Sequence, residues 1–96
     1  MKLEFHPEAE LELIDASVYY ERNIPGLGER FATEVRRATD LLMGAPEIGA
    51  PIDRERRKFV LTSFPYNLIY VPSIDAIRIL AVAHHRRKPG YWRSRV

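Results

Sequence analysis

The residues that could do chemistry gather near the end of this chain. His84 and His85 precede a basic cluster, residues 86–88 (RRK), and a Pro-Gly-Tyr-Trp segment, residues 89–92. Cations beside aromatic rings suit contact with phosphate, nucleic acid or an acidic protein surface. Metal-free phosphodiester cleavage would need an activated hydroxyl, a stabilised phosphate charge and a proton donor. The candidates are Lys58, Arg78 and Arg86 for charge, His84 or His85 as base or acid, and Tyr91 as proton donor or stacking platform.

The two histidines are not expected to form a metal site. Neighbouring residues of a strand point to opposite faces, so His84 and His85 cannot readily share one ion. No other His, Asp or Glu residues have ligand spacing, and the chain has no cysteine. We therefore predict no metal and no cofactor, and the lack of cysteine favours a reducing cytoplasm.

Charge is distributed unevenly along the sequence. Residues 1–53 carry a net charge of −6 and residues 54–96 a net charge of +8, within a total of +2. This asymmetry has two interpretations: a solvated acidic helical half that offsets an arginine-rich strand half, or a basic face for nucleic acid or an acidic partner. The run of Arg54, Arg56, Arg57 and Lys58 is either solvated or paired with an acidic segment of a partner.

Length and composition predict one globular domain, residues 1–96, that ends in a basic tail, residues 86–96. The chain is 46% hydrophobic and 29% charged, which is typical of a folded protein. No apolar run approaches the roughly 18 residues that a membrane span requires. The first residues also lack the apolar stretch of a signal peptide.

Hydrophobic periodicity and turn residues predict an α+β fold. A short strand leads into two helices that form an antiparallel hairpin, and three strands in an antiparallel segment follow. The helices are expected to cover one face of one small sheet. The predicted strands are 3–5, 57–63, 66–71 and 77–84, the predicted helices are 7–23 and 28–43, and residues 44–55 are predicted to be a loop.

The first predicted helix carries apolar residues on two sides. Ala9, Leu13, Ala16 and Tyr20 form one stripe, while the other lies nearly opposite. One stripe can face the sheet and the other the second helix, or part of this surface can be left for a partner. The second stripe consists of Leu11, Ile14 and Val18.

Alternation in the last strand predicts which side chains face the helices. We expect Ile77, Ile79, Ala81 and Ala83 to face the helices, together with Phe59 and Leu61. The opposite face, predicted to be open apart from the tail, would carry a mixed apolar and basic set: Lys58, Val60, Thr62, Arg78, Leu80, Val82 and His84. Tyr91 and Trp92 would anchor a target on this side or fold back over the core edge, and the two roles are compatible.

Six short segments, in order along the chain, resemble the RelE/ParE superfamily of bacterial toxins. They are residues 5–10 (FHPEAE), 19–21 (YYE), 25–31 (PGLGERF), 64–70 (FPYNLIY), 79–84 (ILAVAH) and 89–92 (PGYW). The resemblance implies a strand–helix–helix–three-strand fold and a toxin of a type II toxin–antitoxin system, as in plasmid stabilisation modules. It further implies a cognate, ParD-like antitoxin that wraps the toxin in a hetero-oligomer.

The superfamily divides by target, and this division gives three hypotheses. ParE-like members act on DNA gyrase and are not nucleases, whereas RelE-like members cut mRNA in the ribosome. RelE-like members usually place an arginine where this chain has Asn67, which disfavours a ribonuclease. We therefore expect a gyrase inhibitor, with an mRNA endoribonuclease as the first alternative and a degenerate, non-toxic antitoxin-binding module as the second.

These hypotheses assign catalytic, target-binding and antitoxin-binding roles to particular residues. The nuclease would use Lys58, His84, Arg86 and Tyr91. Target contacts are predicted at Arg78, Arg86, Arg87, Tyr91, Trp92 and Arg93. Antitoxin contacts are predicted at Leu11, Ile14, Val18, Arg56 and Lys58.

Overall fold

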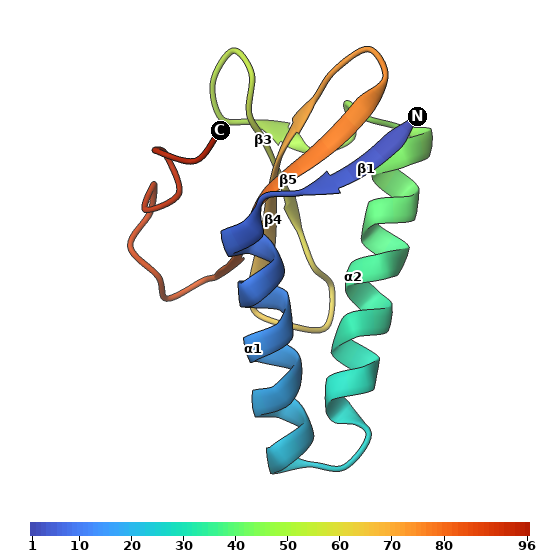
Figure 1. Cartoon of the computed structure of the whole chain (residues 1–96), viewed down its shortest axis with the longest axis vertical. Helices are drawn as coiled ribbons and strands as arrows, with labels where there is room; N and C mark the ends of the chain where they lie inside the picture. The colour runs from blue at the N-terminus through green and yellow to red at the C-terminus, as the bar shows by residue number, and fades with distance from the viewer.

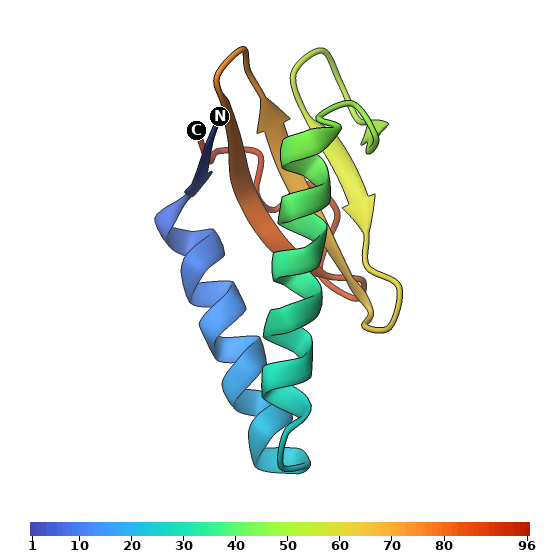
Figure 2. The same ribbon diagram turned by 90° about the vertical axis from the view of Figure 1, so that its right-hand side faces the viewer.

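In the computed structural model, which describes residues 1–96, two helices pack on one face of a five-stranded sheet (Figures 1 and 2). The elements are β1 (Lys2–Phe5), α1 (Pro7–Asn23), α2 (Leu27–Gly44), β2 (Ala50–Pro51), β3 (Arg57–Val60), β4 (Tyr66–Pro72) and β5 (Ala76–His84). The predicted α+β class and the predicted order of helices and long strands are confirmed. Neither helix combines the length and apolar character that a membrane crossing requires.

Local sequence explains where the helical hairpin begins and turns. His6 caps α1, since its Nδ1 accepts a hydrogen bond from the Glu8 amide at 3.0 Å, and Pro7 occupies the first helical turn. Gly26, at φ 89°, makes the left-handed turn between the helices. A Cβ on Gly28 would collide with the Ser17 carbonyl oxygen, so glycine lets the two helices approach closely.

The sheet has the strand order β1-β5-β4-β3-β2. β1 runs parallel to β5, and the remaining neighbours are antiparallel. The two-residue β2 lies within the predicted loop and pairs with Arg57 and Lys58. β3 ends at Val60 rather than at Ser63, because the amides of Thr62 and Ser63 donate to the Glu34 carboxylate at 2.7 and 3.0 Å.

The face of the sheet beneath the helices holds the larger hydrophobic core. This helix-face core joins the buried side of α2, formed by Phe31, Val35, Ala38 and Leu42, to β4 and β5. It contains a group of aromatic rings 4.9–6.3 Å apart between centroids. The rings are Tyr20, Phe31, Phe64 and Tyr66. Burial of these side chains fixes the helical hairpin on the sheet.

A β-bulge at Leu80 makes part of the predicted face assignment wrong. Ile69 of β4 pairs with Ala81 while Tyr70 pairs with Ile79, so Leu80 is an extra residue in β5. The alternation therefore reverses beyond it. Ile77, Ile79, Phe59 and Leu61 pack with the helix-face core as predicted, but Val82 and His84 lie on the helix side, whereas Ala81 and Ala83 lie on the opposite side.

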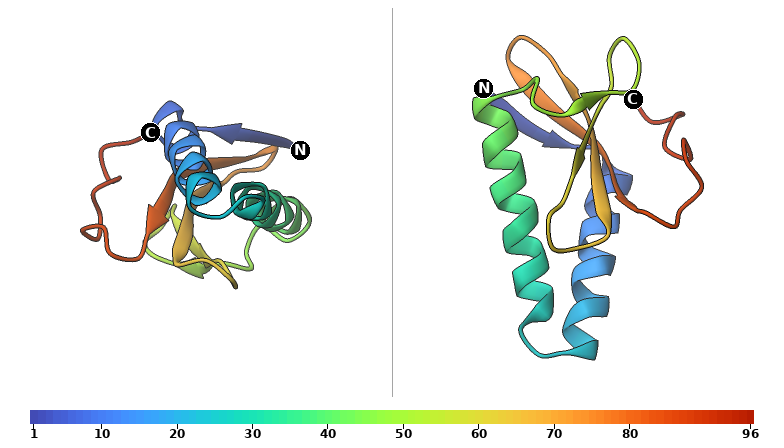
Figure 3. Two further views of the ribbon diagram at one scale, coloured as in Figure 1. Left: turned by 90° about the horizontal axis from the view of Figure 1, so that it is seen from below. Right: turned by 180° about the vertical axis from the view of Figure 1, so that it is seen from behind.

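The C-terminal tail, residues 86–96, packs over part of that opposite face. Trp92 is only 5% exposed and forms a tail-face cluster with Ile69, Leu80, Ala81 and Ala83. Figures 2 and 3 show the tail on the side of the sheet away from α2. Of the two roles predicted for Trp92, the structure therefore shows the one in which it folds back over the sheet.

Candidate functional site

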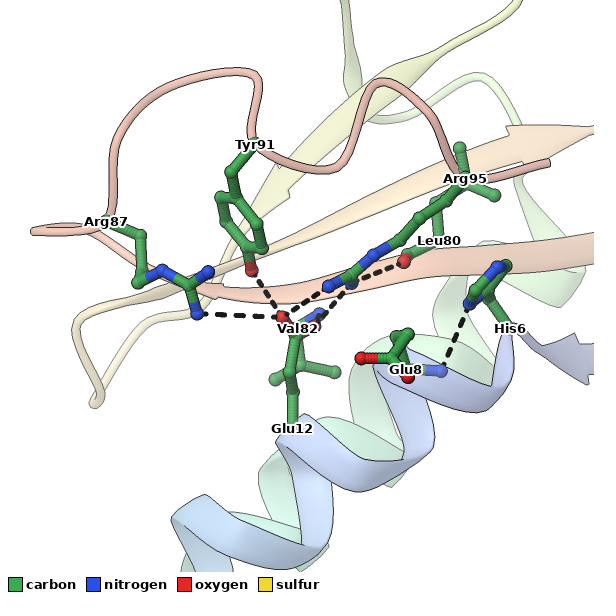
Figure 4. Close-up of polar contacts among 8 residues, drawn as sticks. All are labelled: His6, Glu8, Glu12, Leu80, Val82, Arg87, Tyr91 and Arg95. Carbon is green, nitrogen blue, oxygen red and sulfur yellow. Dashed lines mark hydrogen bonds and ion pairs between the residues drawn. The ribbon is translucent and has the colours of Figure 1, made fainter.

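A partly buried carboxylate on α1, that of Glu12, holds the C-terminal tail against the sheet (Figure 4). Glu12 Oε2 accepts a hydrogen bond from the Tyr91 hydroxyl at 2.7 Å, and its two oxygens accept from Arg95 at 2.9 and 3.1 Å. Arg87 lies 4.0 Å from the same carboxylate. We call these four residues the Glu12 anchor. Charge-assisted bonds of this kind are stronger than neutral ones, and little of the Glu12 or Arg95 side chain reaches solvent.

Sheet topology leaves one backbone amide free for this anchor. β1 pairs with β5 only as far as Ile79, so the Val82 amide has no strand partner on that side. It donates instead to Glu12 Oε1 at 3.0 Å. The Arg95 guanidinium also donates to the Leu80 carbonyl oxygen at 3.0 Å, which ties the tail directly to the bulge.

The anchor changes the proton affinity of its tyrosine and arginine. Burial and the hydrogen bond to Glu12 raise the pKa of Tyr91 well above its usual value. Burial lowers the pKa of Arg95, but the hydrogen bond and negative charge of Glu12 raise it by more. Tyr91 is thus held as a neutral hydrogen-bond donor at physiological pH.

Two arginines and an aspartate surround Trp92 and form what we call the Trp92 clamp. Arg56 and Arg93 lie 5.6 and 5.1 Å from the indole centroid, within the range of cation–π attraction. Asp53 pairs with Arg56 at 2.7 Å and with Arg93 at 3.9 Å. Hydrogen bonds from the Arg56 and Glu55 amides lower the pKa of the Asp53 carboxyl.

A cationic pocket of about 260 Å³ opens between the tail and the ends of β3, β4 and β5. Its lining includes four cations, Lys58, Arg87, Lys88 and Arg93, and no carboxylate. His85 also lines it, with its ring Nε2 3.1 Å from Asn67 Oδ1. Asn67, the position where RelE-like proteins usually have arginine, therefore contacts a histidine in this chain.

The structure brings together three of the four predicted nuclease residues. Lys58, His84 and Tyr91 line the cationic pocket, but Arg86 does not. His84 Nδ1 accepts a hydrogen bond from the Arg86 amide at 3.0 Å, and its ring meets Tyr66 edge-on. Across the chain, no three His, Cys, Asp or Glu side chains lie close enough to hold a metal ion.

The residues predicted to contact a target divide between two places. Arg87, Tyr91, Trp92 and Arg93 gather around the cationic pocket, whereas Arg86 lies outside its lining. Arg78 is separate from them: it donates to the Val96 carbonyl oxygen at 3.1 and 3.2 Å and lies 3.9 Å from Glu4 on β1.

The residues predicted to contact an antitoxin also divide. Leu11, Ile14 and Val18 are between 42% and 51% exposed along α1, so this stripe packs on neither the sheet nor α2. Lys58 is exposed at the pocket, whereas Arg56 belongs to the Trp92 clamp.

Sequence reasoning missed Glu12 and Arg95, which carry the shortest ion pair of the anchor at 2.9 Å. Glu12 is one of several acids on α1, and Arg95 is one of several cations in the tail. Their separation of 83 residues gives no local signal.

Comparison with known proteins agrees with the fold. Residues 3–89 match the family model of the ParE toxin of the type II toxin–antitoxin system parDE. A solved chain of the chromosomal ParDE toxin–antitoxin system from P. aeruginosa has a TM-score of 0.75 and 18% sequence identity. The similarity covers 88% of this chain and 95% of that chain. A search of curated protein sequences found no match.

The α+β fold is therefore that of the RelE/ParE superfamily, as the sequence predicted. Within it, this chain belongs to the ParE toxin family of type II toxin–antitoxin systems.

Proposed function

We propose that this chain is a toxin that inhibits DNA gyrase and is neutralised by a cognate, ParD-like antitoxin. The observation that carries the proposal is the ParE family match over residues 3–89. We further propose that residues 1–96 act as one domain, since the tail packs on the same sheet as the helices. The lack of cysteine supports the proposal that this domain acts in a reducing cytoplasm.

The geometry of the cationic pocket supports a binding role over RNA cleavage. The Tyr91 hydroxyl donates its hydrogen bond to Glu12, and its raised pKa opposes transfer of that proton to a leaving group. His85 is bonded to Asn67, and Arg86 lies outside the pocket. Tyr91 and His85 are thus engaged within the protein, which argues against their acting as the acid–base pair that cleavage would need.

The exposed stripe of α1 supports an antitoxin contact. Leu11, Ile14 and Val18 recur at spacings of three and four residues, which suits the apolar face of a partner segment. Burying three such side chains removes apolar area from water and favours a stable complex. The antitoxin is proposed to cover this stripe and to reach the cations near Lys58.

Gyrase inhibition is tested by following macromolecular synthesis after induction of the protein alone. We expect thymidine incorporation to fall before methionine incorporation, and purified protein to inhibit gyrase supercoiling. An early fall in methionine incorporation would instead favour the ribosome as target. Normal incorporation of both, with soluble protein confirmed, would favour the non-toxic antitoxin-binding module.

The antitoxin contact is tested by co-expression with the short reading frame expected beside this gene. Leu11→Glu or Val18→Glu should weaken the complex at least tenfold, because a charge would be buried without a partner. Glu10→Gln, at a neighbouring exposed position, is the matched control and should bind normally. Undiminished affinity of the folded Leu11→Glu variant would place the antitoxin elsewhere.

A further inference from the structure

The cationic pocket holds positive charge that the protein itself leaves largely uncompensated. Lys58 and Lys88 form no ion pair within 4.0 Å. Arg87 and Arg93 reach carboxylates only at 4.0 and 3.9 Å, and their side chains are 54% and 60% exposed. The closer bonds to those carboxylates belong to Arg95 and Arg56, which lie outside the pocket.

The two arginines are nevertheless held in place. The Arg87 guanidinium lies 3.8 Å from the centroid of the Tyr91 ring, whose hydroxyl is fixed by Glu12. Arg93 lies over Trp92, and the turn at Gly90 has a φ of 81°. A Cβ on Gly90 would stand only 2.7 Å from Arg93 Nε, so glycine leaves room for that side chain. Because these guanidinium groups are already held in place, they can bind phosphate with little further loss of side-chain freedom.

The shape of the pocket limits the size of its ligand. Its volume of about 260 Å³ is close to the lower end of the range for small-molecule sites. Its floor is apolar, formed in part by Ile69, Ala83 and Trp92. A small site with an apolar floor and several cations suits a compact unit that has both a planar apolar part and a multiply charged group.

We propose that this pocket binds a phosphate ester carried by a nucleotide, either free or as one unit of a single strand. Lys58, Lys88 and Arg87 would contact the phosphate, and the exposed guanidinium face of Arg87 or Arg93 would stack on the base. Binding needs no cleavage, so the inference requires none of the acid–base chemistry of a ribonuclease. It also does not depend on gyrase being the target.

The test measures binding to the full-length protein by isothermal titration calorimetry at several salt concentrations. The probes are the oligonucleotide dT5, thymidine 5′-monophosphate, uncharged thymidine and a hexaglutamate peptide. We expect dT5 to bind and thymidine not to bind. If the monophosphate binds as tightly as dT5, a free nucleotide suffices; if only dT5 binds, the site takes a strand, and either result supports a phosphate-ester site.

A pair of charge-matched variants locates the binding site. Lys58→Gln with Lys88→Gln should weaken dT5 binding about tenfold and reduce the slope of log K against log salt concentration by at most about 0.7, because both lysines contact the same phosphate and one neutralised phosphate of a single strand contributes about 0.7. Lys2→Gln with Arg54→Gln removes the same charge from exposed positions outside the pocket and should change binding less than twofold.

Three results would overturn the proposal. They are no binding of dT5 or the monophosphate at millimolar concentration, equal losses in the two double variants, and hexaglutamate binding as tightly as dT5. The last result would assign the pocket to an acidic peptide. None of the probes contains gyrase, so failure here leaves the proposed gyrase inhibition untouched.

Discussion

The two faces of the sheet are stabilised in different ways. On the helix side, 13 buried residues form one continuous core with interlocking aromatic rings. On the tail side, only five buried residues form a cluster, and ion pairs and cation–π contacts around Glu12 and Trp92 hold the segment that covers it. Hydrophobic burial thus fixes the scaffold, while directional polar contacts fix the segment that carries the candidate site.

The largest expected effect comes from truncation in the helix-face core. Leu42 of α2 is fully buried, while its neighbour Leu41 is 46% exposed. Leu42→Ala should lower the free energy of unfolding by about 3 kcal/mol, and Leu41→Ala by less than about 1 kcal/mol, because only the first leaves a cavity. Urea unfolding of the two variants measures this difference, and equal losses would contradict the assignment of the core.

Removal of the anchor carboxylate should have the next largest effect. Glu12→Gln keeps the size of the side chain but leaves Arg95 largely buried without its counter-charge. The loss should be about 2 kcal/mol, below that of a fully buried pair. The emission of Trp92, the only tryptophan, should shift to longer wavelength as the tail loosens.

Glu10→Gln, on an exposed position of the same helix, should leave both stability and emission unchanged. If Glu12→Gln also leaves both unchanged, Glu12 is not what holds the tail.

Alkaline pH should destabilise both faces of the sheet, but by less than the two substitutions described above. Burial raises the pKa of Tyr66 to about 12, and burial with the Glu12 hydrogen bond raises that of Tyr91. A raised native pKa gives stability that is present below the unfolded value of about 10 and is lost as the pH rises above it. Urea unfolding between pH 9 and pH 12 should show this loss.

Single phenylalanine variants separate the two faces. Tyr66→Phe tests the helix side and Tyr91→Phe the tail side, and each should reduce the alkaline loss. Tyrosinate absorbance should show the matching late-titrating group disappear from each variant. An unchanged pH profile in both would show that neither tyrosine is responsible.

The smallest effect is expected at the Trp92 clamp. Asp53→Asn removes the charge that pairs with Arg56 and Arg93, both partly in solvent. Because the native pKa of Asp53 is lowered, its stabilising contribution is present above the unfolded pKa of about 4 and is lost as the pH falls. Below pH 5, the free energy of unfolding of the variant should therefore depend less on pH than that of the parent. The emission of Trp92 should change only slightly. If Asp53→Asn lowered the free energy of unfolding more than Glu12→Gln does, the Trp92 clamp would be the stronger of the two sets of contacts.

Local sequence was sufficient to place the helices and the long strands. Pro7 and the turn at Gly26 bound the first helix, and hydrophobic periodicity placed the second. It was not sufficient for β2, which has two residues and exists only because β3 lies beside it. The end of β3 likewise depends on Glu34, which comes from α2.

The candidate site was predicted only in part, and for a related reason. The sequence indicated the cations near His85 and Tyr91 because they are close together along the chain. It did not indicate that Asn67 would contact His85, or that the Tyr91 hydroxyl would donate a hydrogen bond to Glu12. Those contacts join residues 18 and 79 positions apart, so they depend on how the strands and the tail pack.

The sequence by itself determined the α+β class, the helical hairpin and the basic character of the tail, because periodicity, turn residues and charge are local properties. Only the tertiary structure decided which face each residue of β5 occupies, because one extra residue at Leu80 reverses the alternation beyond it. It also decided that Trp92 is buried and that Glu12 holds the tail, since these contacts bring together α1, the bulge and the tail across the fold.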